Sequence, residues 1–145
     1  MRLRLIPLLV AIVVAVPAVA LAASRAAKPL KFEAYLLGKS EVPKGAPSGK
    51  GTAKITITGT KVCWKFIGIK GISKVTASHI HIGNAGTSGN VVVAFFAGPL
   101  KTTGCVASTA AVVKGIEKNP KGYYVNIHTL KYPGGAIRGQ LHAGD

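Results

Sequence analysis

Short runs in which apolar and polar residues alternate, separated by glycine and proline, fill this chain from about residue 32 to residue 141. A period of two residues is typical of a strand that buries one face, and no long amphipathic helix is visible. The pattern therefore predicts an all-β fold, a Greek-key antiparallel β-sandwich or barrel of about eight strands. The expected strands are residues 32–37, 51–58, 62–67, 75–82, 91–96, 106–114, 123–129 and 136–141, and the alanines of 106–114 would also suit a short helix.

The amino terminus predicts an export signal. Two arginines precede an apolar run from Leu5 to Leu21, which ends in a small-x-small cleavage pattern at Ala20-Leu21-Ala22. Residues 1–22 are therefore expected to be a signal peptide, 23–31 a short linker and 32–142 the folded domain. An uncleaved membrane anchor is the alternative, because about 20 apolar residues span a bilayer. In both cases the domain is expected outside the cytoplasm, secreted or in the cell envelope.

Basic residues greatly outnumber acidic ones. Of the 19 lysines and arginines, two precede the apolar run, which leaves 17 against four acidic residues and a formal charge of +13. So few carboxylates argue against mechanisms that need two acids, such as glycoside hydrolysis. The charge predicts attraction to anions such as envelope polymers, lipid headgroups or a small anionic substrate. The plainer interpretation is a solvated surface, in which Lys54, Lys61 and Lys65 protect sheet edges.

Cys63 and Cys105 are the only cysteines of the chain. In an exported protein, two cysteines on separate expected strands predict a disulfide bond. Thiolate ligation of a metal would need both sulfurs reduced, so it is the minor alternative. Nucleic acid is not an expected partner, because the chain has an export signal and lacks a basic helix and an aromatic stacking motif.

Three of the four histidines lie on expected strands. His79 and His81 are two residues apart and must project from one face, opposite Ile80, while His128 lies opposite the aliphatic side of another strand. Neutral imidazoles are common ligands of copper and zinc, and three of them leave a position open. The spacing thus predicts a metal site of His79, His81 and His128, with copper favoured over zinc. His142, close to the carboxyl terminus, is a candidate fourth ligand.

Tyr132-Pro133-Gly134-Gly135 predicts a type II turn that folds residues 136–141 back on residues 123–129. Arg138 then comes near His128 along the strand direction. Whether the two side chains share a face depends on a register that the sequence does not reveal. Arg138 is interpreted either as an outward polar residue or as a group that draws an anion toward the metal.

Several motifs together resemble the CHRD domain, named for its occurrence in chordin. The resemblance covers residues 32–141 and implies an extracellular domain. In chordin these domains belong to an antagonist of growth factors, and that role is not carried over to a single domain behind a signal peptide. The motifs are Phe32-Glu33-Ala34-Tyr35-Leu36-Leu37-Gly38, Glu41-Val42-Pro43, Ala77-Ser78-His79-Ile80-His81-Ile82-Gly83, Gly122-Tyr123-Tyr124-Val125-Asn126-Ile127-His128-Thr129 and Gly134-Gly135-Ala136-Ile137-Arg138-Gly139-Gln140-Leu141.

A more distant resemblance links His79, His81, His128 and Arg138, in that order, to the copper ligands and the anion-steering arginine of copper/zinc superoxide dismutases. It implies a superoxide dismutase-like barrel, with an immunoglobulin-like sandwich as the alternative. This chain has neither histidine nor aspartate between Ile82 and Ile127. The bridging histidine and the zinc ligands of that family therefore have no counterpart here.

The sequence leaves three functions open. The first is an exported CHRD-domain binding module that holds a copper ion through three histidines. The second is a copper-only superoxide dismutase-like enzyme in which Arg138 steers the substrate, so that enzymatic activity is left undecided. The third is an interaction module without metal, which binds an anionic envelope polymer or another extracellular protein.

Overall fold

A computed structural model describes residues 28–145 of the chain. The predicted signal peptide, residues 1–22, lies outside the described residues, as does most of the expected linker 23–31. The first strand, β1 (Leu30–Leu37), begins two residues before the expected start of the domain. Within residues 28–145, no helix has the length and apolar character needed to cross a membrane.

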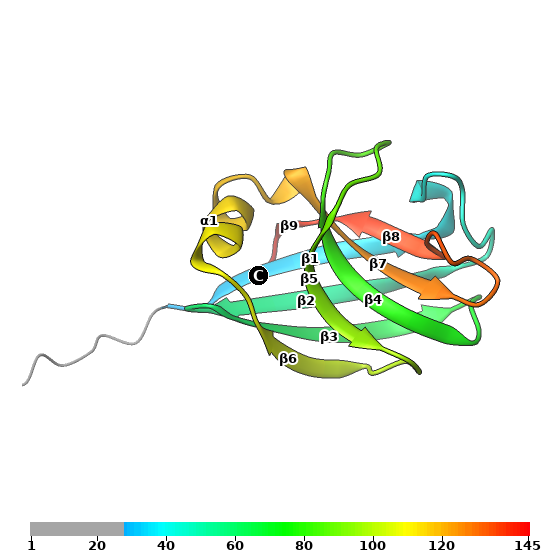
Figure 1. Ribbon diagram of the computed structural model, residues 1–145, viewed down its shortest axis with the longest axis horizontal. Coiled ribbons are helices and arrows are strands. Elements are labelled where there is room, and N and C mark those ends of the chain that lie inside the picture. The colour runs from blue at the N-terminus through cyan, green and yellow to red at the C-terminus, as the bar shows by residue number, and fades with distance from the viewer. Residues whose placement is uncertain (1–27) are drawn as a thin grey trace, which may run out of the picture.

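The all-β fold is confirmed. Antiparallel strands form a nearly closed sheet that is folded into two layers (Figure 1), in the order β5-β4-β7-β8-β1-β2-β3-β6, with β9 also paired to β1. A helix, α1, covers one end of the sandwich. The elements after β1 are β2 (Lys50–Thr58), β3 (Lys61–Lys70), β4 (Val75–Ile82), β5 (Val91–Ala97), β6 (Thr103–Ala107), α1 (Ala110–Lys118), β7 (Tyr123–Thr129), β8 (Ile137–Gln140) and β9 (His142–Ala143), with short 3-10 turns η1 (Gly38–Ser40) and η2 (Pro120–Gly122).

The connections follow the expected Greek-key pattern. Hairpins join β1 to β2, β2 to β3, β4 to β5 and β7 to β8, whereas β6 lies beside β3 and β7 lies beside β4. A strand that returns beside the one three positions earlier is the mark of a Greek key. The consequence for the site is that β4 and β7, about 45 residues apart in the sequence, form adjacent strands.

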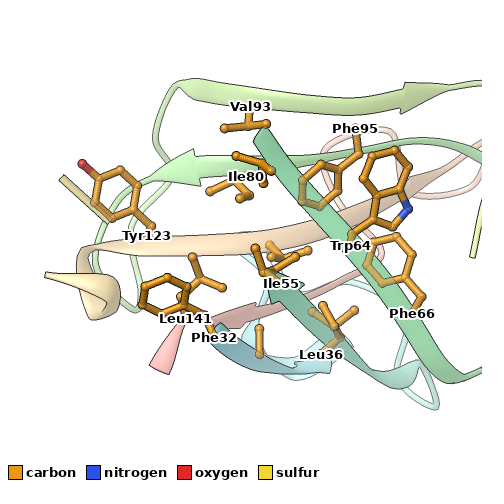
Figure 2. Packing of buried hydrophobic residues seen from close by; sticks show 14 of the residues in the cluster. Phe32, Leu36, Ile55, Trp64, Phe66, Ile80, Val93, Phe95, Tyr123 and Leu141 are labelled. Atoms are coloured by element: carbon orange, nitrogen blue, oxygen red, sulfur yellow. The ribbon is translucent and has the colours of Figure 1, made fainter. Parts of the chain in front are cut away.

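The inward side chains of the two layers meet in one core (Figure 2). The indole of Trp64 on β3 stacks on the ring of Phe95 on β5, with centroids 4.8 Å apart, and Phe66 and Phe96 pack around this pair. The indole N–H of Trp64 donates to the carbonyl oxygen of Lys101 at 3.0 Å, so no polar atom of this ring is left unpaired. Aromatic packing therefore joins β3 and β5 across the sandwich.

One expected strand, residues 106–114, is wrong. The chain forms β6 over Thr103–Ala107 and then the helix α1 over Ala110–Lys118. The hydroxyl of Thr109 accepts from the backbone N–H of Val112 and caps the helix, while Ile116 is fully buried. The short helix that the alanines of this segment also suited is the correct alternative, and it turns Ile116 toward the core.

The expected role of Lys54, Lys61 and Lys65 in protecting sheet edges is also wrong. β2 is paired on both sides by β1 and β3, and β3 is paired on both sides by β2 and β6. The end strands of the order are β5 and β6. These lysines thus lie on interior strands, where they cover a sheet face rather than an edge.

The predicted disulfide bond is confirmed. Cys63 on β3 and Cys105 on β6 are directly opposite in the ladder and are bonded, with their Cα atoms 4.0 Å apart. The bond ties the end strand β6 to the interior of the sheet. A disulfide is consistent with a location outside the cytoplasm, where thiols oxidise.

Replacing both Cys63 and Cys105 with serine should lower the free energy of unfolding by about 2–4 kcal/mol, because a closed loop of about 40 residues no longer restrains the unfolded chain. Denaturant unfolding followed by tryptophan fluorescence measures the change. The reduced wild-type protein serves as the control and should match the variant. An unchanged unfolding midpoint would show that β6 is held by the ladder alone.

Candidate metal centre

The β4–β7 ladder brings the three predicted histidines together. His79 lies opposite Asn126, and Ala77 lies opposite His128, so His79 and His128 are diagonal neighbours on one face of the sheet. His81 lies two residues from His79 on the same face, opposite Tyr124. Diagonal neighbours across an antiparallel ladder are within reach of long side chains. The β4–β7 register therefore brings the three histidines together on one face, which the sequence pattern alone did not establish.

The imidazole rings of His79, His81 and His128 converge. One ring nitrogen from each lies within 4.8 Å of the other two. Three atoms with that spacing have a common central point that is about 2.8 Å or less from each of them. Metal–nitrogen bonds are about 2.0 Å long, so the nitrogens are less than 1 Å too far from that point. The ring centroid of His79 lies 4.9 Å from that of His128 and 5.5 Å from that of His81. Small rotations of the rings suffice to complete a three-nitrogen site.

Backbone carbonyls fix which nitrogen of two rings carries the proton. The Nδ1 of His81 lies 2.8 Å from the carbonyl oxygen of Gly89, and the Nδ1 of His128 lies 2.8 Å from that of Pro133. A carbonyl oxygen only accepts, so each Nδ1 carries the proton and donates. The Nε2 of each neutral ring then keeps its lone pair, which is the form that binds a metal.

His79 completes the geometry. Its Nδ1 lies 3.1 Å from the Nε2 of His128. Because that Nε2 has a lone pair, the Nδ1 of His79 donates to it in the metal-free protein. Two nitrogens each about 2.0 Å from one metal, at angles of 90° to 110°, are about 2.8–3.3 Å apart, and 3.1 Å falls within that range. Metal binding here requires only that His79 carry its proton on Nε2 instead.

Burial favours the neutral form of His79 and His81. Desolvation, followed by the neighbouring His128 and His81, lowers the pKa of His79 to about 4. Desolvation also lowers the pKa of His81, against the opposing effect of the Gly89 carbonyl that accepts its proton. Imidazoles that stay neutral near pH 7 have their lone pairs available for a metal.

The three histidines do lie opposite the aliphatic core, as expected, but this face is not open to solvent. His81 is 8% exposed and His128 is 9% exposed, and only His79 is half-buried. The loop between β4 and β5, which rises above the sheet in Figure 1, supplies Gly89, and the loop between β7 and β8 supplies Pro133. Ala94 on β5 is paired with His79 and is exposed, so the remaining access is from the β5 side.

The phenol ring of Tyr124 and the guanidinium of Arg138 form a stack with the imidazole of His81. The phenol ring of Tyr124 on β7 lies nearly parallel to the imidazole of His81, with centroids 4.9 Å apart and 7° between the planes. The guanidinium of Arg138 on β8 lies over the same phenol ring, 4.4 Å from its centroid. These contacts hold the orientation of the His81 ring.

Arg138 shares the histidine face, since it lies opposite Asn126, but it is not the outward residue that the sequence suggested. It is 2% exposed. Its Nε donates to the carbonyl oxygen of Ser40 at 2.6 Å and its Nη1 to that of Thr87 at 2.8 Å. A guanidinium so enclosed ties two loops to the sheet, and this does not fit a role in drawing anions from solvent.

Glu41 is the acidic partner of Arg138. Its Oε2 lies 3.9 Å from the Nε of Arg138, and both side chains are 2% exposed. Burial raises the pKa of Glu41 to about 7, while the charge of Arg138 opposes this rise. Gly135 passes so close that an added Cβ would lie 2.5 Å from the carboxylate, which explains the glycine there. Sequence reasoning missed Glu41 because nothing in its spacing points to Arg138.

The predicted turn at Tyr132–Gly135 is closed by the N–H of Gly135, which donates to the carbonyl of Tyr132 at 3.1 Å. It is not a type II turn, because that type requires a positive φ at Gly134, whereas the positive φ of 142° is at Gly135. The turn still delivers the Pro133 carbonyl to His128.

His142 is not a fourth member of the cluster. It lies on β9 beside β1, in the other layer, where its ring stacks on that of Tyr35 with centroids 5.0 Å apart. The cluster in the described part of the chain thus consists of His79, His81 and His128. Both cysteines are bonded to each other, so the donor set is three nitrogens with no thiolate.

Buried polar atoms without partners also lie on this face. The Nε2 of His81 and the Oδ1 of Asn126 are both buried and have no hydrogen-bond partner. An unsatisfied buried group costs about 1–3 kcal/mol, so such atoms call for an explanation. For His81, a metal ion at the centre of the three rings would supply the missing partner. The residues present therefore fit a metal held by imidazoles.

A family model described as the CHRD domain matches residues 32–141. The chain belongs to the CHRD domain family. The match covers the strands of both layers and all three histidines, and it confirms the resemblance drawn from the motifs. No curated protein and no solved structure gave a match. The cluster in this CHRD domain is thus described from its own geometry.

Sequence reasoning missed the groups that orient the rings. Gly89 and Pro133 act through backbone carbonyls, which every residue has, so no residue type points to them. Tyr124 was visible as a neighbour of His128 in the strand, but its stacking on His81 depends on the β4–β7 register. A glycine at position 89 was the one available signal, since an added Cβ would clash with the carbonyl oxygen of Ile82.

The low pKa of His79 predicts a pH-dependent stability for the metal-free domain. Between about pH 6.5 and pH 4 the unfolded chain binds a proton at His79 that the folded chain does not, so this contribution is fully present above pH 6.5 and is lost as the pH falls toward 4. Relative to His79→Gln, the wild type should lose about 1–3 kcal/mol across this interval. Comparing the two proteins cancels the opposite contribution of Glu41. Parallel curves would contradict the assignment.

Arg138→Met should lower the free energy of unfolding by about 3–5 kcal/mol, because it leaves Glu41 buried without its positive partner and two carbonyls without a donor. Adding Glu41→Met to it should recover part of this loss. Urea unfolding of the single and double variants gives both values. A stability equal to that of the wild type would instead support an exposed, steering Arg138.

Proposed function

We propose that this CHRD domain is an exported binding module that holds one copper ion through the Nδ1 of His79, the Nε2 of His81 and the Nε2 of His128. The observation that carries the proposal is that two carbonyls fix the protons of His81 and His128 on Nδ1, which leaves both Nε2 lone pairs free in a cluster whose ring nitrogens lie within 4.8 Å of one another. Such outer-shell hydrogen bonds are the usual support of metal-binding histidines.

The choice of copper rests on the donor set. Three imidazole nitrogens without thiolate or carboxylate suit copper and zinc alike. For a given set of nitrogen ligands, affinity rises along the series to Cu²⁺ and falls again at Zn²⁺. The 3.1 Å separation of the His79 and His128 nitrogens corresponds to an angle of about 100° at a metal 2.0 Å from each, which suits either ion, so the choice rests on this order of affinity. Zinc is therefore the weaker competitor for the same site.

A copper-only, superoxide dismutase-like enzyme is the second candidate. The half-buried edge of His79 beside the exposed Ala94 favours it, because a small anion could reach a metal from that side. The formal charge of +13 for the expected mature chain would raise the local concentration of such an anion. Superoxide disappearance with copper-loaded protein, measured against free copper at the same concentration, separates an enzyme from a binding module.

Untagged protein should take up about one Cu²⁺ per chain, with nitrogen hyperfine coupling in its electron paramagnetic resonance spectrum. His79→Gln, His81→Gln or His128→Gln should each weaken copper binding by more than the 10- to 100-fold that results from loss of an outer-shell partner. Competition titrations against a chelator of known affinity measure this.

His142→Gln is the matched control, because it removes a histidine of the other layer and should leave copper affinity unchanged. If His142→Gln weakens binding as much as the cluster variants do, the ion is bound elsewhere. If neither copper nor zinc binds to the wild type, the interaction module without metal is the correct alternative.

A further inference from the structure

The outer face of β1, β2 and β3 carries a set of lysines on the opposite side of the sandwich from the histidines. Their positions follow from the register: the inward residues of these strands are apolar, and the residues between them face out. We call this set the lysine face. It consists of Lys31, Lys50, Lys54, Lys61, Lys65 and Lys70, all exposed.

Two pairs of these lysines oppose each other directly. Lys54 lies opposite Lys65, and Lys50 lies opposite Lys70. Directly opposed like charges destabilise a sheet, since their Cβ atoms are about 5 Å apart. Protection of an edge does not account for them, because β2 and β3 are paired on both sides. The opposed lysines on these interior strands therefore call for an explanation other than edge protection.

A bulge keeps the lysines on one side. Between Lys50 and Thr52 the β2–β3 register shifts, and Gly68, with a φ of 62°, takes up the extra residue in β3. Without that residue, Lys70 would have the same side-chain parity as the inward Phe66. The bulge restores Lys70 to the face of Lys61 and Lys65. Along β3, Lys61 and Lys65 are four residues apart, or about 13 Å.

The face carries little negative charge. Glu33 lies on it and pairs with Lys54, with Nζ and Oε1 2.9 Å apart, and Asp145 also acts on Lys54. Glu41 is buried on the histidine side. The other lysines of the face have no ion pair among the described residues. Their charges are therefore available to a partner.

An exposed aromatic ring lies among these charges. Tyr35 on β1 is 62% exposed and stacks on His142, while Ile67, opposite Thr52 on the same face, is 41% exposed. A flat, rigid aromatic surface bordered by cations suits the ring face of a sugar and its acidic groups better than a lipid surface, which favours projecting apolar side chains.

From this arrangement we propose that the lysine face binds an acidic polysaccharide, laid over β2 between the lysines of β3 and Tyr35 of β1. The opposed lysine pairs contact the carboxylates or other acidic groups of neighbouring sugars, and Tyr35 packs against a sugar ring. The proposal does not depend on metal at the histidine cluster, which lies on the other layer.

The test uses polygalacturonate, a linear polymer with a carboxylate on each sugar, and the neutral polymer dextran, in binding titrations at low and high salt. The wild type should bind polygalacturonate and not dextran, with affinity that falls as salt rises. Replacing Lys50, Lys61, Lys65 and Lys70 together with glutamine should weaken binding about tenfold or more.

The matched control replaces Lys44, Lys114, Lys121 and Lys131 with glutamine, which removes the same charge from exposed positions outside the lysine face. This variant should bind within about twofold of the wild type. Equal losses in the two quadruple variants would mean that only net charge matters, and would overturn the proposal.

Glu33→Gln provides an independent test in the opposite direction. It frees Lys54 from its ion pair and should tighten polygalacturonate binding about two- to fivefold. Glu117→Gln makes the same change of net charge on the exposed side of α1 and should have little effect. No difference between these two variants would contradict the assignment, as would binding to vesicles of phosphatidylglycerol and phosphatidylcholine with no binding to polygalacturonate.

Discussion

The antiparallel ladder between β4 and β7 is the constraint on which the site depends. It sets His79 opposite Asn126 and His128 two residues further along, so that three rings meet on one face while Ile80, Val125 and Ile127 are buried on the other. A slip of one residue would exchange the two faces of either strand. Because three aliphatic side chains would then lose their place in the core, burial on the inner face fixes the histidines on the outer one.

The two layers carry different chemistry. Over the β4–β7–β8 layer, loops bring carbonyl oxygens to His81, His128 and Arg138. Desolvation on this face lowers the pKa of His79 and of His81. On the outer side of the β1–β2–β3 layer, exposed lysines stand on interior strands in opposed pairs. The core of aromatic and aliphatic side chains separates the two (Figure 2). The proposed cation site and the proposed anion surface thus lie on opposite sides of the core.

Local alternation and residue type were enough to predict most of the strands and the grouping of the histidines. Seven of the expected strands, the disulfide bond and the shared face of His79 and His81 depend on spacing that the chain itself displays. The helix α1 was predicted only as an alternative, because the alanines of this segment suit a helix whereas its valines are typical of a strand. The burial of Arg138 could not be predicted, since it results from carbonyls of Ser40 and Thr87, which are distant in the sequence.

The central claim is that one metal ion sits among His79, His81 and His128. Crystals of the untagged domain grown with Cu²⁺ test it directly, through anomalous diffraction at the copper absorption edge. The account predicts a single strong peak about 2.0 Å from the Nδ1 of His79, the Nε2 of His81 and the Nε2 of His128. A peak at His142 or another surface position, with none among these three rings, would contradict it.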